Sequence, residues 1–135
     1  MKPMLFGSAA VLFAAMTAMP SLAAVDTAVI VKGTSSAAPA ASTIDDLVGK
    51  WTMQDLNALS GAKTVTVFDT KIVYGGNDLA MLSDADTRAI GDLQKLHQAI
   101  DANATLKAWF AKNKIDVNRV ITVTTNNGAV DLYLY

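Results

Sequence analysis

The sequence predicts a small α+β domain with a β-α-α-β-β core, in which a helical hairpin covers one face of a three-stranded sheet. Asn127-Gly128 lies between two β-branched runs and predicts a hairpin, because both central residues of a type I′ turn need positive φ. Apolar residues recur at helical spacing from Ala89 to Ile100, whereas Lys63 to Tyr74 contains a β-branched, alternating run. One or two short helices are expected before this core.

The chain opens with a leader typical of bacterial export. Lys2 precedes an uncharged apolar stretch from Met4 to Met19, which is shorter than the about 20 residues of a membrane-spanning helix. Ser21 and Ala23 are small residues in the relation that a signal peptidase needs, which predicts cleavage after Ala23. We therefore expect residues 1–23 to be removed, with no stable membrane insertion afterwards, and the mature protein to be periplasmic or secreted. The alternative is a retained N-terminal anchor, which the helix-breaking Pro20 disfavours.

The composition of residues 24–42 predicts a flexible linker. Its second half, Thr34 to Ser42, is rich in Ala, Ser and Pro and offers little to bury. Val29-Ile30-Val31 is a β-branched run that predicts either a short strand within residues 28–32 or an apolar patch in a tail. Residues 43–135 are then the single globular domain.

Capping signals mark the first half of this domain. Thr43 is suited to cap a first helical turn. Thr52 and Asp55 have the spacing of a capping box, and Gly61 is placed to end the helix that follows. The first strand region is expected from Lys63 to Tyr74, where β-branched residues alternate with polar ones, and Gly75-Gly76 is expected to end it.

The second half begins with the helical hairpin. Ser83 and Asp86 have capping-box spacing and predict the start of a helix that carries the apolar stripe to Ile100. Asn103 is placed to cap a shorter helix, in which Trp109 and its apolar neighbours face the core. Trp109 is accordingly expected to be an anchor between the helices and the sheet.

The last strand supplies the candidate interaction surface. Alternation directs Val130, Leu132 and Leu134 toward the helices, so Tyr133 and Tyr135 are expected on the opposite, open face. Tyrosine is enriched at the energetic centres of interfaces. We therefore expect this face to meet a protein partner or a second copy of the chain by strand addition.

Charge and cysteine content exclude several classes of protein. The chain has 11 Lys and Arg against 12 acidic residues, a net charge of −1, and the charges are evenly spread. A nucleic-acid surface or a polybasic membrane patch needs a strong basic excess, which is absent. There is no Cys, so no disulfide framework supports the fold and stability rests on the hydrophobic core.

No catalytic, metal or cofactor motif stands out from the sequence. His97 is the single histidine, and a zinc site needs three or four ligands. Asp84, Asp86 and Asp92 resemble calcium ligands in type but lack the loop pattern. Ser60 has no nucleophile-elbow motif. No catalytic, cofactor-binding or metal residue is therefore predicted.

These observations favour a non-enzymatic, exported interaction or binding module that uses Tyr133 and Tyr135. The alternative is a small periplasmic hydrolase or other enzyme with a site around His97. The two differ in what surrounds the imidazole: converging Asp or Ser oxygens favour an enzyme, and apolar packing favours a module.

Overall fold

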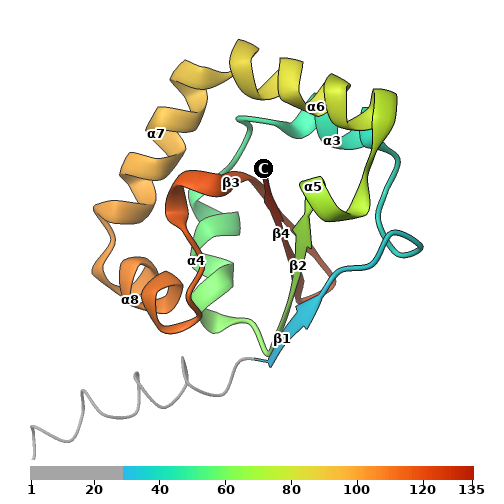
Figure 1. Ribbon diagram of the computed structural model, residues 1–135. Helices are drawn as coiled ribbons and strands as arrows, with labels where there is room; N and C mark the ends of the chain where they lie inside the picture. Colours follow the sequence, from blue (N-terminus) through green and yellow to red (C-terminus); the bar gives the residue numbers. More distant parts are fainter. Residues whose placement is uncertain (1–28) are drawn as a thin grey trace, which may run out of the picture.

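The structure is a computed structural model that describes residues 29–135, so the predicted signal peptide and its cleavage site lie outside the described residues. Figure 1 shows the arrangement of the elements. Their order is β1 (Val29–Lys32), α3 (Ala41–Leu47), α4 (Met53–Gly61), β2 (Thr64–Asp69), α5 (Thr70–Val73), α6 (Gly76–Arg88), α7 (Ile90–Asp101), α8 (Ala104–Lys112), the 3-10 turn η2 (Val117–Arg119), β3 (Val120–Asn126) and β4 (Ala129–Leu134).

The strands form one mixed sheet in the order β1-β2-β4-β3. β1 and β4 both run parallel to β2, and β3 pairs antiparallel with β4. Val67 of β2 has Lys32 as its partner on one side and Leu132 on the other. The α+β class is confirmed, and the sheet has a fourth strand, β1, beyond the three that were expected.

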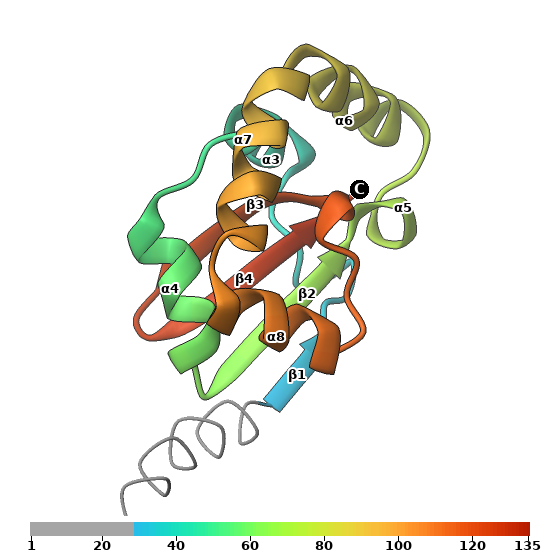
Figure 2. The same ribbon diagram turned by 90° about the vertical axis from the view of Figure 1, so that its left-hand side faces the viewer.

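Helices α4, α7 and α8 lie on one side of the sheet, and α3 and α6 lie beyond the end toward which β2 and β4 point (Figures 1 and 2). Trp109 of α8 is fully buried, as predicted, and its ring meets Phe110 edge-on at 5.1 Å between centroids. The strand residues predicted to face the helices, Val130, Leu132 and Leu134, are also buried. The core therefore lies between these helices and the sheet.

Three local signals form the structures that the sequence predicts. The Thr52 hydroxyl accepts a hydrogen bond from the Asp55 N–H at 3.0 Å and caps α4. Asn103 Oδ1 caps α8 by accepting from the N–H groups of the second and third residues beyond it. Asn127 and Gly128 have φ of 51° and 82°, which the hairpin between β3 and β4 requires.

Three predicted boundaries are wrong. The first helix begins at Ala41 rather than at Thr43. The strand expected through Tyr74 ends at Asp69, because the Asp69 carboxylate accepts from the Lys71 N–H and caps the short helix α5. Ser83 lies inside α6, which begins at Gly76, and its carbonyl accepts from the Thr87 hydroxyl. A capping-box spacing in mid-helix is thus only a coincidence of residue types.

The described part of the expected linker contributes to the domain. Residues 29–32 form a strand of the sheet, and Ala41 is buried at the start of α3. Between them, the carbonyl of Pro39 accepts a hydrogen bond from the Tyr74 hydroxyl. This contact holds the small-residue segment against the end of α5.

Candidate interaction site

His97 connects α7 to the start of β3. Its Nε2 lies 2.8 Å from the carbonyl oxygen of Val120, and the ring is half-buried. His97 and Lys71 lie close enough to Asp86 to affect the ionisation of its carboxyl. Burial raises the pKa of the Asp86 carboxyl, and the positive charges of His97 and Lys71 oppose that rise. Within residues 29–135 no Ser or Asp side chain hydrogen-bonds to the ring. The imidazole is therefore engaged in holding a helix to the sheet.

The expectation that Tyr133 lies on an open face is wrong. Tyr133 is only 3% exposed, and its ring stacks on Phe68 of β2, with centroids 5.1 Å apart and an interplanar angle of 11°. Burial raises the pKa of the Tyr133 phenol to about 12, and the negative charge of Asp131 adds to the rise. Tyr133 is a core residue.

The chain that follows β1 closes this part of the second face. Gly33 approaches the Phe68 ring so closely that a Cβ there would lie 2.2 Å from Cδ1. Tyr74, which is bound to the Pro39 carbonyl, is near enough to Tyr133 to influence its ionisation. Strand alternation correctly separates Tyr133 from the inward-facing leucines, but it cannot reveal what covers the other side.

Tyr135 is engaged within the molecule as well. Its N–H donates to the Arg119 carbonyl at 2.8 Å, and the Lys71 ammonium lies 4.7 Å from its ring centre. Arg119 in turn forms an ion pair with Asp69 at 2.8 Å. The pair Tyr133 and Tyr135 therefore does not form the free surface that the sequence predicts.

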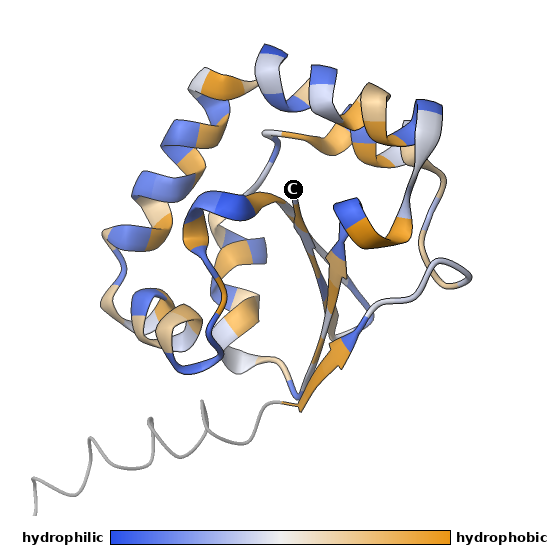
Figure 3. Ribbon diagram, in the orientation of Figure 1, coloured by the Kyte–Doolittle hydropathy of each residue, from blue (hydrophilic) through white to orange (hydrophobic). Residues whose placement is uncertain are grey.

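An open surface exists instead at β1. All four residues of this strand are exposed, with Val29, Ile30 and Val31 at 57%, 38% and 41%. Figure 3 shows β1 as a hydrophobic strand at the margin of the sheet. β1 pairs with β2 alone, so its other edge has no strand beside it among the described residues.

The hydrogen bonds of β1 show which backbone groups face outward. The Val29 N–H donates to the Lys63 carbonyl at 2.9 Å, and the Gly33 N–H donates to the Val67 carbonyl at 2.8 Å. Backbone groups alternate in direction along a strand, so the N–H and C=O groups of Ile30 and Lys32 point away from β2. The open edge thus offers two donors and two acceptors.

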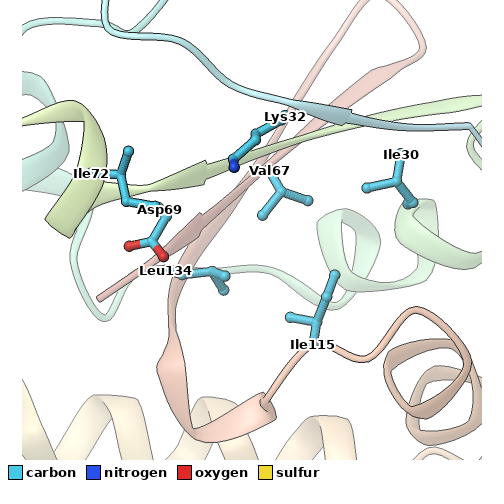
Figure 4. Close-up of a pocket in the computed structure, with 7 residues that line it drawn as sticks. All are labelled: Ile30, Lys32, Val67, Asp69, Ile72, Ile115 and Leu134. Atoms are coloured by element: carbon cyan, nitrogen blue, oxygen red, sulfur yellow. The ribbon is translucent and has the colours of Figure 1, made fainter.

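A groove of about 330 Å³ adjoins this edge on the side of the helices. Figure 4 shows the side chains that surround it, which come from β1, β2, α5, β4 and the loop before η2. The lining residues are Ile30, Lys32, Val67, Asp69, Ile72, Ile115 and Leu134. Asp69 is paired with Arg119, whereas Lys32 makes no ion pair with any residue in 29–135. The groove is therefore mainly apolar, and the Lys32 ammonium on its β1 wall has no ion-pair partner within the described part of the chain.

Other kinds of site find no support in the described residues. Residues 29–135 contain no group of three or more side chains placed to hold a metal ion. In the same range no helix is both long and apolar enough to cross a membrane. No protein-family model, curated protein or solved structure matches this chain. Its function has to be argued from the geometry of the β1 edge.

Sequence reasoning left β1 open, as a short strand or an apolar patch in a tail, and did not select it as the candidate site. The signal was Val29-Ile30-Val31, three consecutive β-branched residues. Such a run fits a buried central strand as well as an edge. Its position at the margin follows from parallel pairing with β2, more than thirty residues away in sequence, which no local pattern specifies.

Proposed function

We propose that this protein is an exported, non-enzymatic interaction module that binds another polypeptide chain by strand addition at the open edge of β1. The observation that carries the proposal is the β1 edge, which has no strand beside it among residues 29–135 and where exposed apolar side chains flank outward-facing backbone groups. The leader, with its expected cleavage after Ala23, supports export.

Strand addition suits the chemistry of this edge. Main-chain hydrogen bonds to Ile30 and Lys32 supply affinity that is independent of the partner's sequence. Val29 and Val31 lie on one face of the strand, and Ile30 lies on the other beside the groove. A partner strand therefore buries apolar surface on both faces of the sheet, in addition to forming backbone bonds.

β1 also lacks most features by which proteins protect their edges. Natural edge strands are shielded by proline, bulges, inward-pointing charges or a covering segment. β1 contains no proline, has a regular register with β2, and carries one charge, Lys32, at its end. An edge left in this state is a candidate binding surface.

Site-specific photo-crosslinking in the exporting cell tests the proposal. A photoreactive amino acid at Val31 is expected to give discrete crosslinked products, because Val31 lies on the exposed edge strand. Ile90, the first residue of α7, is 61% exposed and apolar, so the same photoreactive residue there is the matched control. Ile30→Pro, which removes an outward N–H, is expected to abolish the Val31 products.

The presence or absence of crosslinked products decides between the outcomes. Products from position 31 that disappear with Ile30→Pro and are absent from position 90 support strand addition, whatever the partner. Absence of products from position 31, or products that persist with Ile30→Pro, would overturn the proposed function.

A further inference from the structure

We infer, building on the proposed function, that the strand added at β1 carries an acidic side chain opposite Lys32 and a large apolar side chain opposite Ile30, with one residue between them. Ile30 and Lys32 both line the groove beside β1. The partner is thus an extended polypeptide segment that presents one acidic and one apolar side chain on the same face.

The register of the sheet places Ile30 and Lys32 on the side of the helices. Ile30 pairs with Val65 and Lys32 pairs with Val67, and paired residues of neighbouring strands share a face of the sheet. Val65 is fully buried, and Val67 lines the groove. Side chains of an added strand that lie opposite Ile30 and Lys32 therefore stand on this same face, at the open margin of the groove.

Charge determines which side chain suits the position opposite Lys32. Figure 4 shows the Lys32 side chain directed toward Val67, across the wall of the groove. Asp69, the acidic residue of the groove lining, is already in an ion pair with Arg119 at 2.8 Å. Lys32 has no ion-pair partner among residues 29–135. An acidic side chain on the added strand complements this ammonium, whereas a basic one is repelled by it.

Apolar surface determines which side chain suits the position opposite Ile30. Ile30 is 38% exposed, and the groove beyond it is walled by Val67, Ile115 and Leu134. The groove has a volume of about 330 Å³, at the lower end of the about 300 to 1,000 Å³ typical of small-molecule pockets. It therefore suits a large side chain of an added strand, which buries the exposed apolar surface beside Ile30.

The backbone fixes the spacing of the two side chains in the partner. Ile30 and Lys32 direct their N–H and C=O groups away from β2, so they are the residues of β1 that bond to an added strand. Val31 lies between them and faces the other side of the sheet. Because side chains alternate with the same period in both chain directions, the acidic and apolar residues are separated by one residue in a parallel or an antiparallel partner.

Peptides that differ only in the order of their residues test this spacing. The probes are the capped peptide Thr-Val-Glu-Thr-Phe-Val-Thr, which fits antiparallel pairing, and its reverse, which fits parallel pairing. The control, Thr-Val-Thr-Glu-Phe-Val-Thr, has the same composition but places Glu and Phe on opposite faces of a strand. Each is titrated into the isotope-labelled exported protein, expressed from its full sequence, and followed by amide NMR signals. One of the probes is expected to bind at least about tenfold more tightly than the control and to shift the Ile30 and Lys32 amides most.

A charge swap tests whether Lys32 selects the acidic residue. Lys32→Glu is expected to weaken binding of the better probe at least about tenfold, and Lys in place of Glu in that probe should restore it. Lys95→Glu, at an exposed position on α7, makes the same change in net charge and should bind as wild type does.

Two results would overturn the inference. One is that neither probe binds more tightly than the control with altered spacing, and the other is that Lys32→Glu leaves the affinity of the probe unchanged. The proposed function fails on a different observation, the loss of discrete crosslinked products from position 31. Crosslinks from Val31 that disappear with Ile30→Pro would therefore keep strand addition standing even if the partner lacks this side-chain pattern.

Discussion

The two edges of this sheet differ in whether other residues of the chain hydrogen-bond to them. At β3, the Gly49 N–H donates to the Ile121 carbonyl at 2.9 Å, and the Thr122 hydroxyl donates to the Lys50 carbonyl at 2.8 Å. At β1, the chain supplies no corresponding cover among the described residues. The chain covers the β3 edge with its own residues. An uncovered edge is therefore a particular feature of β1 and not a general consequence of the fold.

The closed edge depends on a glycine. Gly49 has φ of +81°, and a Cβ there would lie 2.9 Å from the Ala89 Cβ. A residue with a side chain could not bring the turn after α3 this close to both β3 and the α6 to α7 junction without strain. The corresponding segment after β1, which begins at Gly33, passes over Phe68 instead and leaves the edge free.

The largest expected effect comes from removing the core on which both edges rest. Trp109→Ala should lower the free energy of unfolding by about 3 to 5 kcal/mol, because a fully buried indole is replaced by a cavity. Denaturant titration measures the loss. His97→Ala, which removes a single hydrogen bond to Val120, should cost only about 1 kcal/mol. A reversed order would contradict the placement of Trp109 as the anchor of the core.

A smaller effect should come from disturbing the closed edge. Gly49→Ala is expected to cost about 1 to 3 kcal/mol, because it combines positive φ with a close contact to Ala89. Gly61→Ala is the matched control, since a Cβ there would meet nothing within 4 Å. Equal stabilities of the two variants in thermal unfolding would show that the turn at Gly49 is not held as described.

The burial of Tyr133 on the second face of the sheet should lower the stability of the fold at alkaline pH. The pKa of Tyr133 is raised to about 12 from 10.0 in the unfolded chain, so the fold favours the neutral phenol. That contribution to stability is complete below pH 10 and is lost as pH rises through about 12. Tyr133→Phe should therefore reduce the alkaline loss of stability, whereas Tyr135→Phe should retain it. An unchanged alkaline limb in Tyr133→Phe would place Tyr133 outside the core.

The smallest effect separates the two sides of β1. Ile30→Pro removes an outward N–H, whereas Val31→Pro removes one that faces β2 in the parallel ladder. Val31→Pro should therefore be less stable than Ile30→Pro by about 1 kcal/mol, the net contribution of one hydrogen bond. Equal losses in denaturant titration would contradict the direction assigned to these groups.

Local chemistry determined how much of the fold was predictable. Thr52, Asn103 and Asn127-Gly128 act through neighbours a few residues away, and each does what the sequence indicates. Trp109 was predictable as core because a large apolar side chain in a helical stripe has to be buried. The prediction that a helix begins at Ser83 is wrong, because α6 already begins at Gly76.

The candidate site was less predictable, because it depends on contacts distant in sequence. The burial of Tyr133 requires Phe68 and the chain around Gly33, neither of which a pattern in the last strand can specify. The run Val29-Ile30-Val31 indicated a strand, but its place at the margin is set by pairing with β2. Strand alternation correctly assigned two faces and could not say which surface stays uncovered.

Amide hydrogen exchange of the isolated protein tests the central claim most directly, because it measures the β1 edge residue by residue. The amides of Val29 and Gly33, bound to β2, and of Gly49, bound to β3, should be protected. Those of Ile30 and Lys32, which face away from β2, should exchange about tenfold or more faster. Protection of the Ile30 and Lys32 amides equal to that of Val29 and Gly33 would contradict an open edge at β1.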